Sequence, residues 1–257
     1  MHHIFLADVH LGAFHEEKNK QLEESLIQLI DYCEENSIQI HLLGDLFDYW
    51  MEYENYTPPL GKTVLSRFRI YNEKFNSFYI TGNHDFWTRG HFTDLGFNIK
   101  TEHASIDLDG KCMLMFHGDG LSDDTFQLSR PFLNDFIRKP GFVRLFQSIF
   151  DGEAGNHFMK EFSEFTRDEN DMNPEHLSRW AKNYLSESHY DVIITGHDHL
   201  PRMETYNHGI YINPGAFHQH LTVIQYTNKA FKLVVWSNEE HKLVPFADQP
   251  EEIKFYE

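Results

Sequence analysis

The N-terminal half of the chain alternates between short apolar runs and segments whose apolar residues recur every three or four positions. Apolar runs at 4–7, 38–43 and 78–80 are separated by two segments of the second kind. Short runs are typical of buried strands and the longer period of amphipathic helices. The pattern therefore predicts strand–helix–strand units and a parallel sheet flanked by helices. The residues with helical spacing are Leu22, Leu26, Leu29, Ile30 and Cys33, then Val64, Phe68, Tyr71 and Phe75.

Further short apolar runs predict strands in the second half of the chain. They lie at 112–116, 192–195, 210–212, 221–226 and 231–236. The last two are separated by Thr227-Asn228-Lys229, which we expect to form a hairpin connection.

Polar clusters follow five of these predicted strands, each at the carboxyl end. The clusters are Asp8-Val9-His10, Gly44-Asp45-Leu46-Phe47-Asp48, Gly82-Asn83-His84-Asp85, His117-Gly118-Asp119 and Gly196-His197-Asp198-His199. Ligands of α/β sheets collect outside the carboxyl ends of the strands. We therefore expect the five clusters to face one crevice.

The residue types in these clusters are typical of metal ligands. Asp8 and His10 are two positions apart, as are His197 and His199, and in extended chain such pairs project to the same side. Carboxylate, amide and imidazole donors suit manganese, iron or zinc, and the absence of thiolates argues against a cysteine-rich structural zinc site. One such cluster would be weak support for a site, but five in order strongly favour one.

These motifs resemble those of the calcineurin-like metallophosphoesterases, over almost the whole chain. The resemblance implies an α/β fold, a four-layer αββα sandwich. It implies two metal sites that share Asp45, with the ligands Asp8, His10, Asp45 and His199 in one and Asp45, Asn83, His117 and His197 in the other. His84 would donate a proton or hydrogen bond to the phosphoryl oxygen or leaving group. Asp85 could orient the His84 ring and Asp48 could support the site, although both also suit turn capping.

A centre of this kind predicts a metal-dependent hydrolase. Two cations about 3.5–4 Å apart activate water and clamp both sides of an in-line displacement at phosphorus. We therefore expect direct attack by water without a phosphoenzyme. Mn²⁺ is the expected cofactor, with iron and zinc left open by the same ligand set.

Longer strings around the motifs resemble one branch of the family, the UDP-2,3-diacylglucosamine pyrophosphatases. They run from Gly44 to Trp50, from Gly82 to Phe86 and from His117 to Asp124. The resemblance implies cleavage of this lipid-linked UDP-sugar to UMP and 2,3-diacylglucosamine 1-phosphate, in lipid A biosynthesis. Candidate substrate contacts are Asn83, Asp124 and Arg167.

Two departures from this branch keep other functions open. Some members carry Arg where this chain has His84, and Thr is common where Asp198 stands. A general metallophosphodiesterase or phosphatase acting on a soluble ester is the alternative. A non-catalytic scaffold of the same fold is a remote one, because scaffolds of this kind lose metal ligands and the implied ligands are all present.

A phenylalanine-rich segment between the fourth and fifth motifs predicts a helical cap. We expect one domain over 1–257 with a cap insertion at about 121–188. Phenylalanines at 142, 146 and 150, and at 158, 162 and 165, would share helix faces, and residues 130–144 carry four basic side chains against one acidic. An apolar cap with a basic rim would suit acyl chains and an anionic membrane surface, although packing of the cap onto the core explains the phenylalanines equally well.

Composition narrows the partners further. The formal net charge of −18 should repel nucleic acid. No stretch reaches the roughly 18 apolar residues of a membrane span, so we expect a soluble cytoplasmic protein with peripheral contact to the cytoplasmic face of the inner membrane. Cys33 and Cys112 fall in a predicted helix and a predicted strand, which disfavours a disulfide. Nothing in the sequence implies a protein partner.

Overall fold

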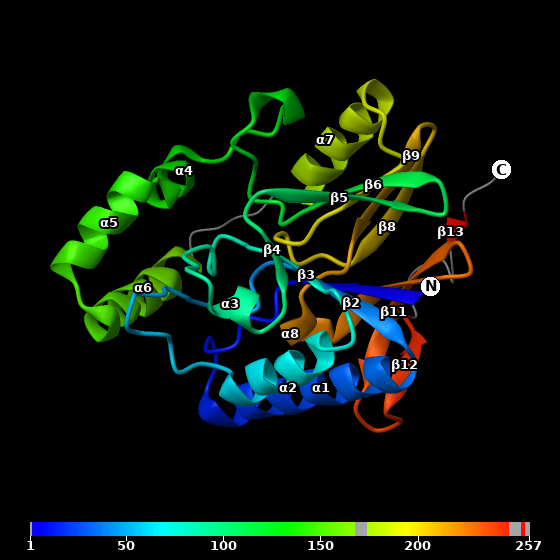
Figure 1. The fold of residues 1–257 in the computed structure, drawn as a ribbon. Coiled ribbons are helices and arrows are strands. Elements are labelled where there is room, and N and C mark those ends of the chain that lie inside the picture. The colour runs from blue at the N-terminus through cyan, green and yellow to red at the C-terminus, as the bar shows by residue number, and fades with distance from the viewer. Residues whose placement is uncertain (1, 168–173, 247–252, 255–257) are drawn as a thin grey trace.

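The computed structural model describes residues 2–167, 174–246 and 253–254, and within them two β-sheets lie face to face (Figure 1). The first sheet has the order β12-β11-β10-β1-β2-β3-β4, with β13 paired to β11. Strands β1 to β4 run parallel, and β10 joins β1 antiparallel. The strands are β1 (His2–Leu6), β2 (Ile38–Leu43), β3 (Phe78–Ile80), β4 (Asn98–Lys100), β10 (Thr222–Thr227), β11 (Ala230–Ser237), β12 (Lys242–Pro245) and β13 (Ile253–Lys254).

The second sheet has the order β5-β6-β7-β9-β8. Strands β6, β7 and β9 are parallel, and β5 and β8 are antiparallel edge strands. The strands are β5 (His103–Leu108), β6 (Lys111–Phe116), β7 (Val192–Ile194), β8 (Arg202–Tyr206) and β9 (Gly209–Asn213).

Three apolar cores hold four layers together. Phe5 and Leu43 of the first sheet share a core with Met115 and Ile194 of the second. Helices α1 (Glu16–Glu35) and α2 (Lys62–Asn72) cover the outer face of the first sheet, and α7 (Pro174–Glu187) covers that of the second. The predicted αββα sandwich is confirmed.

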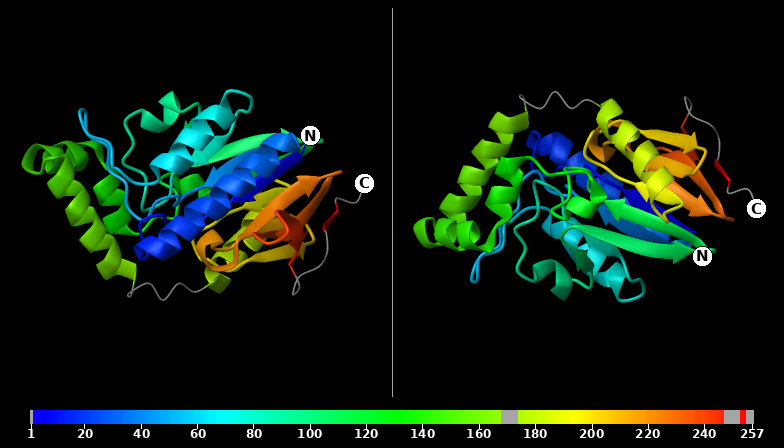
Figure 2. Two further views of the ribbon diagram at one scale, coloured as in Figure 1. Left: turned by 90° about the horizontal axis from the view of Figure 1, so that it is seen from below. Right: turned by 90° about the horizontal axis from the view of Figure 1, so that it is seen from above.

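Three helices form an arm that extends from one side of the sandwich, as both views of Figure 2 show. They are α4 (Phe132–Arg138), α5 (Pro140–Ile149) and α6 (Gly152–Arg167). Their apolar faces pack on one another and on Met51 and Trp87. Arg138 ties the arm to the sandwich, because its guanidinium donates to the carbonyl of Gly82 and to Asp119. This arm is the part of the predicted cap segment that lies away from the sheets, whereas α7 belongs to the sandwich.

The strands predicted from apolar runs are present, and the hairpin is confirmed. Asn228 and Lys229 have φ of +52° and +61° and join β10 to β11. Two left-handed central residues match the twist of the flanking strands. Strands β4, β5, β8, β12 and β13 were not predicted. Among the described residues, no helix combines the length and apolarity needed to cross a membrane. Short elements complete the fold: α3 (His91–Asp94), α8 (Phe217–His220) and the 3-10 turn η1 (Asp124–Phe126).

Candidate metal centre

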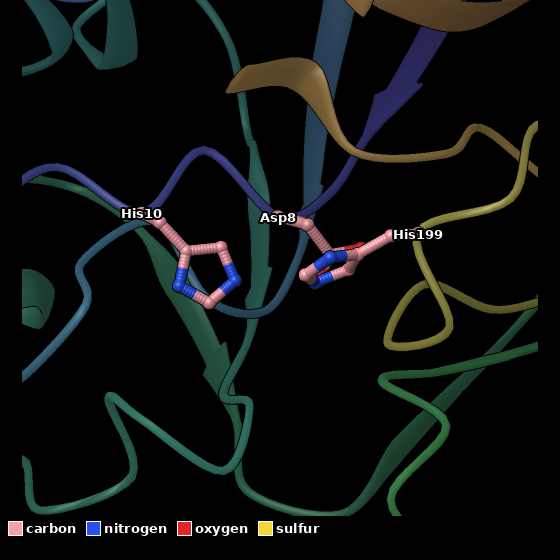
Figure 3. A group of neighbouring side chains, drawn as sticks. All are labelled: Asp8, His10 and His199. Carbon is pink, nitrogen blue, oxygen red and sulfur yellow. The ribbon is translucent and has the colours of Figure 1, made fainter. Parts of the chain in front are cut away.

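The structure brings the five predicted clusters together at the carboxyl ends of the parallel strands. Figure 3 shows Asp8 and His10, from the loop after β1, beside His199 from the loop after β7. One ligand atom from each of these three residues lies within 4.8 Å of the other two. Asp8, Asp45 and His117 form a second such group. The two groups share Asp8 and are largely buried.

Five of the seven predicted ligands have left-handed backbone: Asp8 (φ +55°), His10 (+52°), Asp45 (+53°), His197 (+75°) and His199 (+61°). The interpretation that these pairs converge through extended chain is therefore wrong. The loop after β1 is curled instead, with the amide of Asp8 donating to Gly44 and that of Val9 to Asp45. Left-handed backbone at residues other than glycine is costly and clusters at functional sites.

His117 lies where a positive charge is favoured. Its Nδ1 lies 2.8 Å from the carbonyl oxygen of Leu43 and donates a hydrogen there, because a carbonyl oxygen only accepts. Its Nε2 faces two oxygens, Oδ2 of Asp45 at 3.1 Å and Oδ1 of Asn83 at 3.0 Å. Without a metal ion this nitrogen needs a hydrogen on a positively charged ring, and a bound cation would take the place of that hydrogen.

The pKa shifts of His117 and Asp45 also favour a positive charge beside these carboxylates. Burial lowers the pKa of His117, but the carboxylates of Asp45 and Asp8 outweigh burial and raise it to about 10. Burial raises the pKa of Asp45, yet His117, His84 and His10 hold it well below its usual range. Burial raises the pKa of Asp8 to about 7, against the effect of His117. A bound cation would keep both carboxylates ionised.

Two buried atoms of the centre that could bind a metal have no hydrogen-bond partner. They are Oδ1 of Asp8 and Nε2 of His10. Their unmet bonding capacity shows whether the residues fit a metal. His10 turns its other nitrogen to Oδ1 of Asp48 at 3.2 Å, and Nε2 of His199 lies 3.7 Å from Oδ1 of Asp8. An unpaired buried oxygen or nitrogen is costly, and coordination would satisfy both. The donor set therefore fits divalent ions, and the assignment of ligands to each of two ions stays a prediction.

His84 lies at the edge of the centre and lines a cavity of about 220 Å³ with His10, Asp45, Asn83 and His199. Its Nδ1 lies 2.8 Å from the backbone carbonyl oxygen of Asp48, so Nδ1 carries the hydrogen. Its Nε2 is 4.0 Å from Oδ2 of Asp45. The nitrogen that can reach a substrate is therefore Nε2.

Asp85 supports the turn and not the His84 ring. Its carboxylate accepts hydrogen bonds from the amide of Leu46 (2.8 Å), the amide of Gly82 (2.7 Å) and the hydroxyl of Tyr79 (2.6 Å). The suggestion that Asp85 orients His84 is corrected accordingly. The described partners of the His84 ring are Asp48 and Ser163 of α6.

The three candidate substrate contacts have different outcomes. Asn83 lines the cavity of the centre. Asp124 is exposed on η1 and is not among the residues that line this cavity. Arg167 ends α6, and its side chain lies outside the described part of the chain. Asp124 and Arg167 therefore stay predictions without structural support.

Sequence reasoning missed His218. This residue lies outside the five motifs, but it lines the cavity. Its Nδ1 donates to the backbone oxygen of Asp8 at 2.9 Å, and its ring centroid lies 5.3 Å from those of His10 and His199. The available signal was its position shortly after β9, which runs parallel to β7.

A family model described as Calcineurin-like phosphoesterase matches residues 1–201. The chain belongs to this family. It is thus a metal-dependent hydrolase, and the clustered donors are groups that could hold its divalent metal.

Similar proteins extend this result. The chain is 25% identical over 255 residues to a UDP-2,3-diacylglucosamine hydrolase of Coxiella burnetii, covering 90% of this chain and 98% of the relative. It is 30% identical over 121 residues to a UDP-2,3-diacylglucosamine hydrolase of Porphyromonas gingivalis, a match that spans 45% of each protein. A solved structure of Yfce, a phosphoesterase from E. coli, matches 95% of the chain with a TM-score of 0.50 and 15% identity, which shows the fold.

Proposed function

We propose that the protein hydrolyses the pyrophosphate of UDP-2,3-diacylglucosamine to UMP and 2,3-diacylglucosamine 1-phosphate. The names of the relatives support this substrate, and the donor set supports two divalent ions as cofactors. Mn²⁺ is the proposed metal, with iron and zinc as alternatives.

One structural observation carries the proposal. A groove of about 260 Å³ runs along the arm and shares Asp48, Asn83 and His84 with the cavity of the metal centre. Its arm side includes four apolar residues, Leu133, Ile137, Met159 and Phe162, together with the polar residues Asn134 and Ser163. A ligand that spans both spaces needs an anionic group joined to an apolar one. A phosphorylated sugar with acyl chains has this composition.

The metal ions would polarise a phosphoryl oxygen and activate water. The protein itself places Asn83 and His84 where the two cavities meet. As an imidazolium, with hydrogens on both ring nitrogens, His84 can give the Nε2 proton or a hydrogen bond to the phosphoryl or leaving oxygen. Among the residues described as lining the two cavities no cysteine occurs, and Cys33 is buried in α1, which supports hydrolysis without a covalent enzyme intermediate.

The surface of the arm supports contact with the membrane that holds such a lipid. Large apolar side chains are exposed on it, namely Phe132, Leu133, Phe136, Leu145, Ile149 and Phe158. Exposed apolar groups beside Lys139 and Arg144 suit an anionic bilayer surface. We therefore propose that the protein contacts the cytoplasmic face of the inner membrane. Packing accounts for four further phenylalanines, because Phe142, Phe146, Phe150 and Phe162 belong to the core of the arm. The side chain of Phe165 lies outside the described part of the chain.

A soluble phosphate ester is the second candidate, and His84 favours it, because an imidazole places no permanent positive charge where some lipid-specific members carry Arg. The other departure, Asp198, has a local explanation. Its carboxylate pairs with Arg202 at 2.5 Å and accepts from Asn213 at 2.8 Å, so it stabilises the loop after β7 and does not alter the donor set.

Paired variants test the lipid assignment. Leu133 lines the groove and is 52% exposed, whereas Ile70 is 53% exposed on α2, away from the arm, and is not among the groove residues. Leu133→Asp should lower kcat/KM for detergent-dispersed UDP-2,3-diacylglucosamine about 10-fold or more, the scale of losing one apolar side-chain contact. It should leave hydrolysis of a small nitrophenyl phosphodiester unchanged.

Ile70→Asp is the matched control and should change kcat/KM for neither substrate. If Leu133→Asp left kcat/KM for the acylated substrate unchanged, or if both variants lowered it equally, the groove would not be the acyl site.

A further inference from the structure

Ser163 is a buried polar residue on the apolar inner face of α6. The whole residue is 3% exposed, and its neighbours Met159 and Phe162 on the same helix line the groove. A buried hydroxyl is costly unless it is hydrogen-bonded. Here Oγ lies 3.0 Å from Oδ2 of Asp48 and 3.1 Å from Nδ1 of His84.

The directions of these hydrogen bonds follow from chemistry. Nδ1 of His84 carries a hydrogen, because it also lies 2.8 Å from the carbonyl oxygen of Asp48. The Nδ1 hydrogen of His84 is therefore shared between this carbonyl oxygen and Ser163 Oγ, and the Ser163 hydroxyl donates its own hydrogen to Oδ2 of Asp48. The Asp48 carboxylate is linked to the His84 imidazole through the Ser163 hydroxyl. Its other oxygen, Oδ1, is hydrogen-bonded to Nδ1 of His10. One carboxylate thus holds a predicted metal ligand and the His84 ring.

This arrangement spans two parts of the molecule. Asp48 and His84 belong to loops of the sandwich, and Ser163 belongs to the arm, 115 and 79 residues further along the chain. Ser163 also lines the groove together with His84. The position of α6 therefore decides whether the His84 ring has its second hydrogen-bond partner.

We propose that Ser163 is a positioning residue that makes the docked arm part of the catalytic site. It fixes the His84 ring so that Nε2 faces the phosphate, and it passes the charge of Asp48 to the imidazole. The proposal rests on the proposed role of His84 and not on the identity of the natural substrate. A ligand in the groove contacts the same turn of α6, so occupation of the groove and orientation of His84 are coupled.

A leaving-group series separates this role from a structural one. Ser163→Ala should lower kcat for aryl phosphodiesters about 10- to 100-fold, the scale of a lost hydrogen bond to a charged group. The loss should grow as the leaving phenol becomes less acidic, because poor leaving groups depend most on a proton donor. KM and metal content should stay at wild-type values, and Ser163→Thr should restore most of kcat because it keeps the hydroxyl.

The control is Ser148→Ala, an exposed serine on α5 whose hydroxyl donates to the backbone of Leu145. It should behave as wild type with every ester. An equal loss across the leaving-group series, a loss of metal, or wild-type kcat in Ser163→Ala would overturn the proposal. A failure of UDP-2,3-diacylglucosamine as substrate would refute the proposed function and leave this result standing.

NMR supplies a readout that does not depend on turnover. The Nδ1 hydrogen of His84 should give a protected resonance in ¹⁵N-histidine-labelled wild type, assigned with His84→Gln. In Ser163→Ala this resonance should broaden or disappear through exchange with solvent. An unchanged resonance would show that Asp48 alone holds the ring and would contradict the proposal.

Discussion

A methyl group on Gly82 would lie 2.0 Å from Oδ1 of Asp45. Glycine is therefore required in this motif by contact with the carboxylate that is predicted to bridge two ions. The backbone of the third motif reaches Asp45 through a second contact, since the amide of His84 donates to the same oxygen at 3.0 Å. The turn after β3 and the carboxylate after β2 form one rigid unit.

Substitution of Gly82 should disable the centre without touching a ligand. Gly82→Ala displaces Asp45, and a shift of about 1 Å in such a site costs on the order of 100-fold in rate. We expect kcat/KM for a nitrophenyl phosphodiester to fall by that factor, with reduced metal content. Gly141→Ala on α5 is the matched control, because a methyl group there meets nothing within 4 Å. Full activity in Gly82→Ala would show that Asp45 can move without consequence.

Substitutions of Asp45 and His84 should have different effects, one on metal binding and the other on the chemical step. Asp45→Ala removes the buried carboxylate 3.1 Å from His117 and should abolish metal binding, as measured by elemental analysis of purified protein. His84→Ala should keep the metal and lower kcat about 10²- to 10⁴-fold, the range for loss of a general acid. Equal metal loss in the two variants would contradict this division of roles.

Two histidines far from the metal centre should make stability depend on pH. Nδ1 of His3 lies 3.0 Å from Nε2 of His41, on neighbouring strands β1 and β2. Burial lowers the pKa of His41 to about 3, and burial lowers that of His3 to about 4. The unfolded chain takes up protons near pH 6.5, before the folded protein does. The free energy of unfolding should therefore fall as pH drops from about 6.5 to 4.

The slope should approach about 1.4 kcal/mol per pH unit for each buried histidine. Chemical denaturation of wild type and His41→Phe between pH 4 and 7 measures it, and the variant should show the shallower dependence. His208→Gln, an exposed residue in the turn between β8 and β9, should match the wild-type slope. Parallel curves for wild type and His41→Phe would show that His41 does not titrate on unfolding.

The sequence predicted those parts of the fold whose signal is local. Strand β1 contains the apolar run Ile4 to Leu6, and β2 has buried apolar residues at Ile38, Ile40, Leu42 and Leu43. Strand β8 lacks such a signal, because Arg202 and Glu204 interrupt it. Arg202 is buried because its charge is paired, most closely with Asp198. That pairing depends on tertiary structure.

The site also has parts that the local sequence predicted and parts that depend on the fold. Its donors were predictable from their positions at strand ends, but the left-handed backbone of Asp8 was not, since Asp8-Val9-His10 has no glycine to signal a turn. Ser163 gave no signal either, because its role arises only where α6 approaches Asp48 in the fold.

Release of UMP from UDP-2,3-diacylglucosamine by the purified protein with added Mn²⁺ is the most direct test of the proposed function. The comparison substrates are the same UDP-sugar without acyl chains and a nitrophenyl phosphodiester. The cavity of the metal centre and the apolar groove beside it predict strong preference for the acylated substrate. Comparable turnover of the small substrates, without that preference, would contradict the lipid assignment and leave a general metallophosphoesterase.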